Sequence, residues 1–357
     1  MTLPSFAHVM SMSDGIGMFE HADHAEPRRE EGYCTDDVAR LLIVAVREPA
    51  HSQAVRDLSR TAFRFLAEAQ NVHGRIRNRR DARGRWHGRH GVEDCWGRSL
   101  WAFGTAARRA PEASMRASAI SYFDHGSSQR SPHRRAMAFA ALGAVEVANY
   151  DQRHRQSREL LADAIAVVGS PSPSADWPWP EPRLSYANAA LPEALIAAGD
   201  VLDRPDVVDD GLLLLRWLLD RESLDGHLSP TPVGGASPGD AVGRFDQQPI
   251  EIAALADACH RAHVVTGDDQ WQQGVDLAIA WFAGDNDLGV VMWDPDTHGG
   301  YDGLTATGAN QIKQRPDHAR VVDDPGRRVD FQKALGKQSD DVFAVNKGPV
   351  FVKEKAA

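Results

Sequence analysis

Helical segments that are apolar on all sides alternate along this chain with amphipathic ones, and this alternation limits the folds it can adopt. The segments 136–148, 189–198 and 250–258 are rich in alanine and almost wholly apolar. Each precedes a charged, amphipathic segment, at 151–165, 207–221 and 268–281. Apolar helices belong in the interior and amphipathic ones at the surface. The pattern predicts an all-α chain of helical hairpins, each with an inner and an outer helix, arranged as an (α/α)6-type toroid.

The spacing of apolar residues also places the individual helices. We expect them at 37–46, 52–70, 94–109, 112–123, 132–149, 155–168, 188–203, 206–222, 249–266 and 268–283. Strand patterns are few and short, the clearest being 289–293.

The chain divides into three parts by composition. Residues 1–31 are polar and rich in histidine, which predicts an irregular N-terminal arm, and 32–311 form the toroid domain. All six lysines lie after Gln311, whereas the preceding part uses arginine alone. We therefore expect 312–357 to be an atypical tail, frameshifted or disordered.

Composition also bounds the partners and the compartment. The formal charge of -10 argues against a nucleic acid, and no apolar run approaches the roughly 20 residues that a membrane helix needs. The start of the chain lacks a signal peptide. Three cysteines without a Cys-x-x-Cys pair favour reduced thiols in the cytoplasm, with no metal and no cofactor.

Three predicted inner helices begin with acidic residues. The stretches are 32–37, 92–96 and 245–251. The inner helices of a toroid are parallel, so their polar starts would converge at one end. Cleavage of a glycosidic bond needs two carboxyl groups, one as acid and one as nucleophile or base. The catalytic candidates are Asp37, Asp94, Asp246, Glu93 and Glu251.

Other polar and aromatic residues near these starts are candidates for holding a sugar. They are Asp36, Arg40, Trp96, Arg98, Trp179, Tyr186, Asn188, Gln247 and Gln248. Two simpler interpretations stay open. Acidic residues at helix starts are also favoured by capping and by the helix dipole. Trp179, in a proline-rich loop with Trp177, could pin that loop to the core instead of stacking on a sugar.

Four motifs together resemble a bacterial family of the six-hairpin glycosidase type, whose members are often encoded beside glycosyltransferases and labelled glycosyltransferase-like. The motifs lie at 32–40, 93–101, 245–251 and 266–271. The resemblance covers about residues 8–311 and implies an (α/α) toroid that acts on, or binds, a carbohydrate. In the family, Asn310-Gln311 would lead into a Gly-x-Glu-Ser turn and a final inner helix. The different sequence here implies a toroid that is incomplete at its C-terminus, which would put activity in doubt.

These observations lead us to expect a glycoside hydrolase or a related carbohydrate-active enzyme. One alternative is a non-catalytic sugar-binding protein that partners a glycosyltransferase. Another is a sugar epimerase or isomerase on the same toroid. An epimerase would need a pair of histidines in the cavity, and only His21 and His24 are placed to offer one. Their spacing otherwise resembles a metal half-site only weakly.

Overall fold

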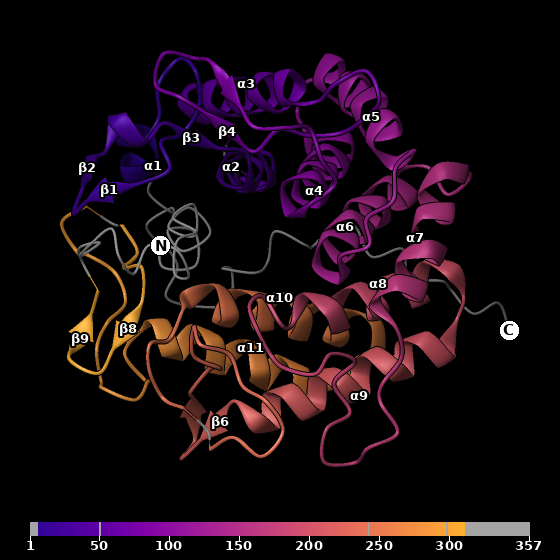
Figure 1. Cartoon of the computed structure of the whole chain (residues 1–357), viewed down its shortest axis with the longest axis vertical. Coiled ribbons are helices and arrows are strands. Elements are labelled where there is room, and N and C mark those ends of the chain that lie inside the picture. The colour runs from indigo at the N-terminus through magenta and orange to yellow at the C-terminus, as the bar shows by residue number, and fades with distance from the viewer. Residues whose placement is uncertain (1–5, 50, 242, 298, 311–357) are drawn as a thin grey trace, which may run out of the picture.

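The computed structural model describes residues 6–310, except 50, 242 and 298, as five helical hairpins in an arc (Figure 1). The predicted tail, 312–357, lies outside the described residues. The inner helices are α2 (Thr35–Arg47), α4 (Asp94–Arg109), α6 (Arg134–Tyr150), α8 (Ala190–Leu202) and α10 (Pro249–Thr266). The outer helices are α3 (Gln53–Ala69), α5 (Ala113–Ser127), α7 (Arg155–Val168), α9 (Pro205–Arg221) and α11 (Asp269–Phe282). The predicted all-α toroid is thus confirmed, with each helix within a few residues of its expected bounds.

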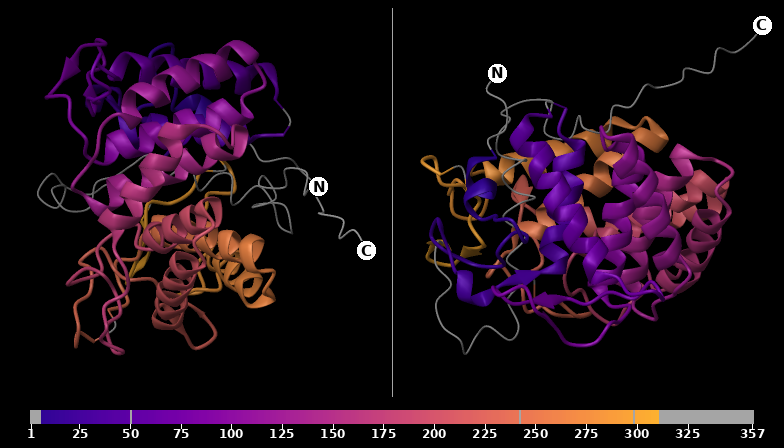
Figure 2. Two further views of the ribbon diagram at one scale, coloured as in Figure 1. Left: turned by 90° about the vertical axis from the view of Figure 1, so that its right-hand side faces the viewer. Right: turned by 90° about the horizontal axis from the view of Figure 1, so that it is seen from above.

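The inner helices pack in chain order. α2 packs against α4, α4 against α6, α6 against α8 and α8 against α10, while each also packs against its own outer helix. Figure 2 shows the same arrangement from two other sides. This order brings the starts of successive inner helices next to one another.

The closest of these contacts joins α4 and α6, and glycines make it possible. A Cβ atom added at Gly97 would lie 2.1 Å from the carbonyl oxygen of Ala136, and one at Gly104 would lie 2.2 Å from that of Gly143. Real Cβ atoms do not approach carbonyl oxygens so closely, so any side chain here would push the two helices apart. The two backbones therefore touch along a seam that runs through both helices.

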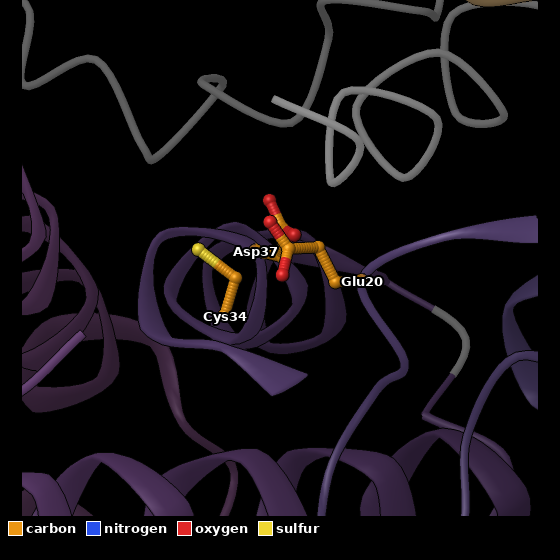
Figure 3. A group of neighbouring side chains, drawn as sticks. All are labelled: Glu20, Cys34 and Asp37. Atoms are coloured by element: carbon orange, nitrogen blue, oxygen red, sulfur yellow. The ribbon is translucent and has the colours of Figure 1, made fainter. Parts of the chain in front are cut away.

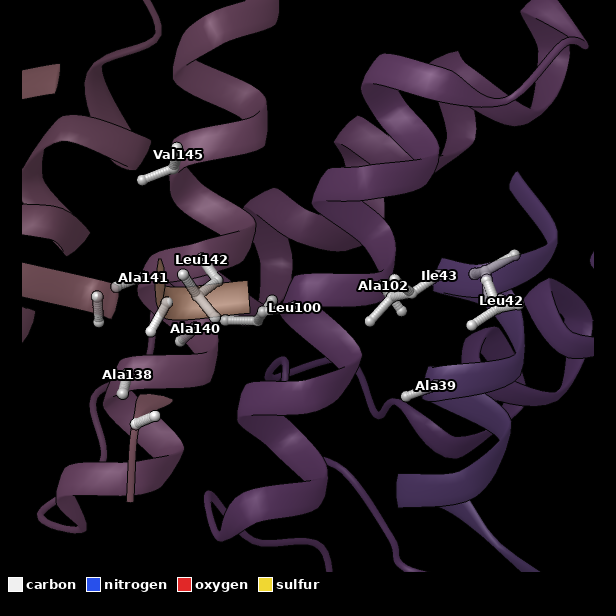
Figure 4. Packing of buried hydrophobic residues seen from close by; sticks show 14 of the residues in the cluster. Ala39, Leu42, Ile43, Leu100, Ala102, Ala138, Ala140, Ala141, Leu142 and Val145 are labelled. Atoms are coloured by element: carbon white, nitrogen blue, oxygen red, sulfur yellow. The ribbon is translucent and has the colours of Figure 1, made fainter. Parts of the chain in front are cut away.

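Small and branched apolar residues fill the space between the neighbouring inner helices. Ala39, Leu42 and Ile43 of α2 are buried, as are Leu100 and Ala102 of α4 (Figure 4). The alanines that make these helices apolar on all sides thus lie in the interior, as their pattern predicts.

Local sequence sets where several helices begin and end. Pro205 and Pro249 occupy the first helical turn, where the missing N–H costs nothing. The side chains of Ser52 and Asp268 accept hydrogen bonds from backbone N–H groups at the starts of α3 and α11. Gly267 ends α10 with a positive φ of 70°.

The N-terminal arm is more ordered than its composition suggests. It contains α1 (Ala7–Ser11), β1 (Ala22–Asp23), β2 (Glu26–Pro27) and a 3-10 turn at Arg29–Glu31. Phe6, Val9, Met12, Met18 and Phe19 belong to the same hydrophobic core as the inner helices. The arm therefore packs as part of the toroid domain.

Short antiparallel strands close several of the loops. β3 (Tyr33–Cys34) pairs with β4 (Arg79–Arg80), which pairs with β5 (Trp86–His87). β6 (Ser223–Leu224) pairs with β7 (His227–Leu228), and β8 (Leu304–Thr305) with β9 (Gly308–Ala309). These pairs hold the loops between hairpins without forming a larger sheet among the described residues.

The predicted strand at 289–293 is wrong. Only Trp293 forms a bridge, with Gly300. The side-chain oxygen of Asn286 accepts hydrogen bonds from the N–H groups of Leu288 and Val290, and its amide donates to the carbonyl of Val290 at 2.7 Å. The Asn286 side chain thus binds the backbone groups that a strand ladder would have used.

None of the helices described is both long enough and apolar enough to cross a membrane.

Candidate active site

Polar side chains at the starts of the inner helices form a chain of contacts across successive helices. Arg98 of α4 reaches Asp36 of α2, with 3.6 Å between Nε and Oδ1. On α6, Arg135 donates from Nη2 to the Asn188 side chain, which lies just before α8, at 3.0 Å. Asn188 donates in turn from Nδ2 to Glu251 of α10 at 3.2 Å. The predicted convergence of the helix starts is therefore present for these residues.

Asp94 lies between α2 and α6, in the middle of this series of contacts. It is the first residue of α4 and is partly buried, whereas its neighbour Glu93 is exposed. Burial, opposed by the charge of Arg98 and supported by that of Asp36, raises the pKa of Asp94 to about 6. Asp94 is thus a carboxyl group that holds its proton at mildly acidic pH.

Asp37 points into the interior rather than toward the other helix starts. Its side chain is fully buried and forms an ion pair with Arg40, which is also buried. Together with Glu20 and Cys34 it forms a cluster in which one ligand-type atom of each residue lies within 4.8 Å of the others (Figure 3). Asp37 and Arg40 were predicted as catalytic and sugar-binding residues, but both lie beneath the surface in this ion pair.

The cluster has the residue types of a metal site, but its charges are already balanced. Glu20 forms an ion pair with Arg79, as Asp37 does with Arg40. Burial, with the nearby charges of Asp37 and Asp36, raises the pKa of the Cys34 thiol well above its usual value. A metal would have to displace two arginines and deprotonate this thiol, so the arrangement fits a buried structural cluster better.

Arg135 binds several groups of the site and was not among the predicted residues. Its Nη1 atom donates to both carboxylate oxygens of Glu181, at 2.9 and 2.8 Å, and its Nε donates to the carbonyl of Tyr186. Its guanidinium also lies 5.3 Å from the centroid of the Tyr186 ring. Arg135 therefore fixes the loop before α8 at the site, with Tyr186 partly exposed there.

Glu251 binds the backbone of the segment just before α8. Its carboxylate accepts hydrogen bonds from the backbone N–H groups of Ala187, at 2.6 Å, and Asn188, at 3.1 Å. Glu251 and Asn188 are both buried. These contacts give the two residues a structural role, and we do not include Glu251 in the reaction proposed below.

The polar stretch before α10 divides between the interior and the surface. Asp246 is exposed, and Gln248 is buried at the cap position of α10. Gln247 is fully buried and turns toward the outer layer, where its amide accepts from Trp281 Nε1 at 3.1 Å and donates to Ser229 and Asp287. Gln247 thus ties loops to α11 and lies away from Asp94.

The two predicted tryptophans are buried. Trp96 donates from Nε1 to the carbonyl of Gly126 at 3.1 Å, which joins α4 to α5. Trp179 is 1% exposed and stacks on Trp217 of α9. Both contacts match the simpler interpretation, in which large side chains pin elements to the core.

An aromatic pair on adjacent inner helices lies near the site and was not predicted. Trp101 of α4 stacks on Phe139 of α6, with their ring centroids 6.1 Å apart, and remains partly exposed. The guanidinium of Arg98 lies 4.0 Å from the centroid of the Phe139 ring. The only sequence signal was the place of both aromatics on inner-type helices.

The histidines are distributed differently from the expected pair. His21 is buried beside Glu20, with 3.9 Å between Nε2 and Oε1, whereas His24 is exposed and contacts Asp23. The exposed His133, which precedes α6, is close enough to Asp94 to affect its pKa. His133 is therefore the histidine that the structure brings to the acidic helix starts.

Comparison with known proteins identifies the fold. No protein-family model matches the chain, and no curated protein matches it either. Among solved structures, a sugar epimerase from a ruminal bacterium has a TM-score of 0.68 at 12% identity, over 94% of this chain and 96% of that chain. The cellobiose 2-epimerase from Spirochaeta thermophila has a TM-score of 0.66 at 13% identity, over 92% of this chain and 91% of that chain.

A metagenome-derived glycoside hydrolase family 9 endoglucanase has a TM-score of 0.54 at 14% identity, over 93% of this chain and 78% of that chain. At these identities the likeness shows the fold alone. The fold that these structures share with the chain is the (α/α)6 toroid.

Proposed function

We propose that this protein is a carbohydrate-active enzyme that hydrolyses a glycosidic bond, with Asp94 as the general acid and Asp36 as the second carboxylate. The observation that carries the proposal is the unequal surroundings of these two neighbours. Burial keeps the proton on Asp94 although the charge of Arg98 opposes it, whereas Asp36 forms an ion pair with Arg98 at 3.6 Å, which favours a negative charge there. Paired carboxyl groups whose environments separate their pKa values are typical of acid/base catalysis.

In this mechanism Asp94 protonates the oxygen of the leaving sugar as the bond breaks. Asp36 then acts on the opposite face of the sugar, either directly as a nucleophile or by activating water. Arg98, Arg135 and Tyr186 would bind hydroxyl groups, and the partly exposed Trp101 would stack on a sugar ring. The exposed Asp246 is a second candidate for the base, from the start of α10.

A panel of aryl glycosides and bacterial oligosaccharides tests the proposal. Asp94→Asn should lower kcat by at least about 100-fold, because general acid catalysis contributes that much or more. Glu93→Gln is the matched control, since Glu93 is the exposed neighbour at the same helix start. The wild-type kcat/KM should fall as pH rises above about 6, where Asp94 loses its proton. Undiminished turnover by Asp94→Asn would contradict the assignment.

Sugar epimerisation or isomerisation is a second candidate, favoured by His133 beside Asp94. It also has support from the solved structures that match this chain over nearly their whole lengths, several of which are titled as sugar epimerases or isomerases. Such an enzyme removes a proton from the carbon next to a carbonyl group. Deuterium incorporation from heavy water into a reducing sugar, lost in His133→Asn and without release of a monosaccharide, would favour this candidate.

The same proteins and sugars also distinguish a third possibility, a non-catalytic sugar-binding protein that partners a glycosyltransferase, from the two enzyme candidates. Thermal stabilisation by a sugar, without turnover or deuterium exchange, would replace both enzyme proposals by sugar binding.

A further inference from the structure

The outer face of the molecule has a hollow between the proline-rich loop that follows α7 and the outer helix α9. Its volume is about 540 Å³. The loop contributes Pro173 and Pro178, and α9 contributes Leu213, Arg216, Trp217 and Asp220. We call this the outer hollow. It lies on an outer helix, whereas Asp94 lies at the start of an inner one, so the two sites are separate.

The outer hollow has a rigid aromatic wall. Trp217 is partly exposed, and Trp177 and Trp179 pack against it with ring centroids 5.1 and 5.9 Å away. Leu213, one turn earlier on α9, is 49% exposed. Two tryptophans thus hold the indole of Trp217 in place beside exposed apolar surface.

The two charged residues that line the outer hollow differ in whether other side chains hold them. Arg216 is held by Gln270 and by the ring of Trp271, whose centroid lies 5.0 Å from its guanidinium. Asp220 is exposed and makes no side-chain hydrogen bond or ion pair with any residue that the structure describes. Among the residues that line the outer hollow, one positive and one negative group balance each other, which favours an uncharged polar ligand over an ionic one. A further arginine, Arg221, lies against the rings of Trp177 and Trp217.

We propose that the outer hollow is a second carbohydrate-binding site, which takes a neutral oligosaccharide. Sugar rings have an apolar C–H face that stacks on an indole and hydroxyl groups that bond to carboxylate and guanidinium groups. Trp217 provides the first contact, and Asp220 and Arg216 provide the second. The volume is within the range of about 300–1,000 Å³ usual for small-ligand sites. A short oligosaccharide therefore fits it.

The loop that forms one wall of the outer hollow also reaches the candidate active site. Trp177 donates from Nε1 to the carbonyl of Glu181 at 2.9 Å, and the carboxylate of Glu181 binds Arg135. The choice of a carbohydrate rests on the proposed function, but binding in the outer hollow does not require Asp94. A site here would hold a chain beside the reaction site rather than in it.

Binding by the full chain, labelled with 5-fluorotryptophan, tests the site. The probes are neutral hexasaccharides of glucose, mannose and xylose, followed by fluorine NMR with Trp217→Phe to assign the Trp217 signal. At least one probe should shift this signal, and Asp220→Ala should weaken its binding about tenfold, the effect of one hydrogen bond to a charged group. Asp209→Ala, an exposed carboxylate elsewhere on α9, is the matched control.

The Asp94→Asn variant separates this proposal from the proposed function. Loss of turnover in Asp94→Asn with an unchanged Trp217 response would support both. A Trp217 signal that no hexasaccharide moves, or binding that Asp94→Asn abolishes and Asp220→Ala leaves intact, would overturn the second site. A response to a proline-rich decapeptide instead of the sugars would also overturn it, because the hollow would then bind a protein segment.

Discussion

The carboxylate of Glu251, in the first turn of α10, accepts hydrogen bonds from the backbone N–H groups of Ala187 and Asn188 at the start of α8. One side chain therefore joins the starts of two inner helices. The N–H groups at a helix start have no partner within the helix. Ala187 has a positive φ of 45°, and its N–H donates to Glu251.

Replacing this carboxylate should cost stability rather than chemistry. Glu251→Ala leaves two buried N–H groups without an acceptor, and we expect the free energy of unfolding to fall by about 3 kcal/mol. Glu251→Gln keeps one acceptor oxygen, so its free energy of unfolding should fall by less. Urea denaturation measures both. A variant that stays as stable as the wild type but loses turnover would show that Glu251 is catalytic after all.

Asp94 should make the protein less stable as pH rises. Its pKa is about 6 in the folded state and about 3.8 in the unfolded chain, so the folded state binds the proton more tightly. The free energy of unfolding should therefore fall between pH 3.8 and about 6 and stay lower above it, by on the order of 2 kcal/mol. Asp94→Asn should remove this loss. Urea denaturation of both proteins from pH 4 to 8 tests this prediction. If the free energy of unfolding changed with pH in parallel for the wild type and Asp94→Asn, the prediction would be contradicted.

Glu146 should have the opposite dependence on pH. It is buried on α6, and Arg47, Arg108 and Arg109 lie 3.3, 3.0 and 3.4 Å from its oxygens. Burial alone would raise its pKa, but these arginines outweigh burial and lower the pKa from 4.5 to about 2. Its contribution to stability is complete above pH 4.5 and is lost as pH falls through about 2.

Glu146→Gln should lower the free energy of unfolding at pH 7 by about 3 kcal/mol, because three arginines lose their shared buried counter-charge. The difference from wild type should shrink as pH falls below 4.5. Glu159→Gln is the control, since the pair of Glu159 with Arg155 is exposed to solvent and contributes little to stability. Equal losses in the two variants at pH 7 would refute this role of Glu146.

The contact between α4 and α6 should not tolerate a methyl group. A Cβ at position 104 would meet the backbone of Gly143 at 2.2 Å, so Gly104→Ala requires the helices to separate. We expect a loss of about 3 kcal/mol or failure to fold. Gly15→Ala is the control, because nothing lies within 4 Å of its added Cβ. Thermal unfolding of both variants tests this, and a Gly104→Ala protein with wild-type stability would disprove it.

The sequence was informative about the fold because burial repeats with the helical period. The apolar stretch at 136–148 could only be an inner helix, and its neighbour at 151–165 an outer one, so the arc of hairpins followed. The N-terminal arm was harder, because its few apolar residues, such as Phe6 and Phe19, have no regular spacing. Their burial depends on long-range packing that no local pattern records.

The site was only partly predictable for a related reason. The spacing identified Asp36, Asp94 and Arg98 as residues at the starts of parallel helices. The spacing could not distinguish Asp94, which is partly buried, from Asp37, which is fully buried in an ion pair with Arg40. Nor could it single out Arg135, because the partners of Arg135 lie 46 to 53 positions away in the chain.

The glycine seam between α4 and α6 also restricts how the site can adapt to a ligand. Because their backbones are in contact, these two helices can neither slide past each other nor twist without a clash. They therefore behave as one rigid unit. Asp94 and Arg98 lie on α4 and Arg135 lies on α6, so their spacing is fixed before a ligand binds. Adjustment to ligands of different size therefore falls to the exposed segment that carries Asp246.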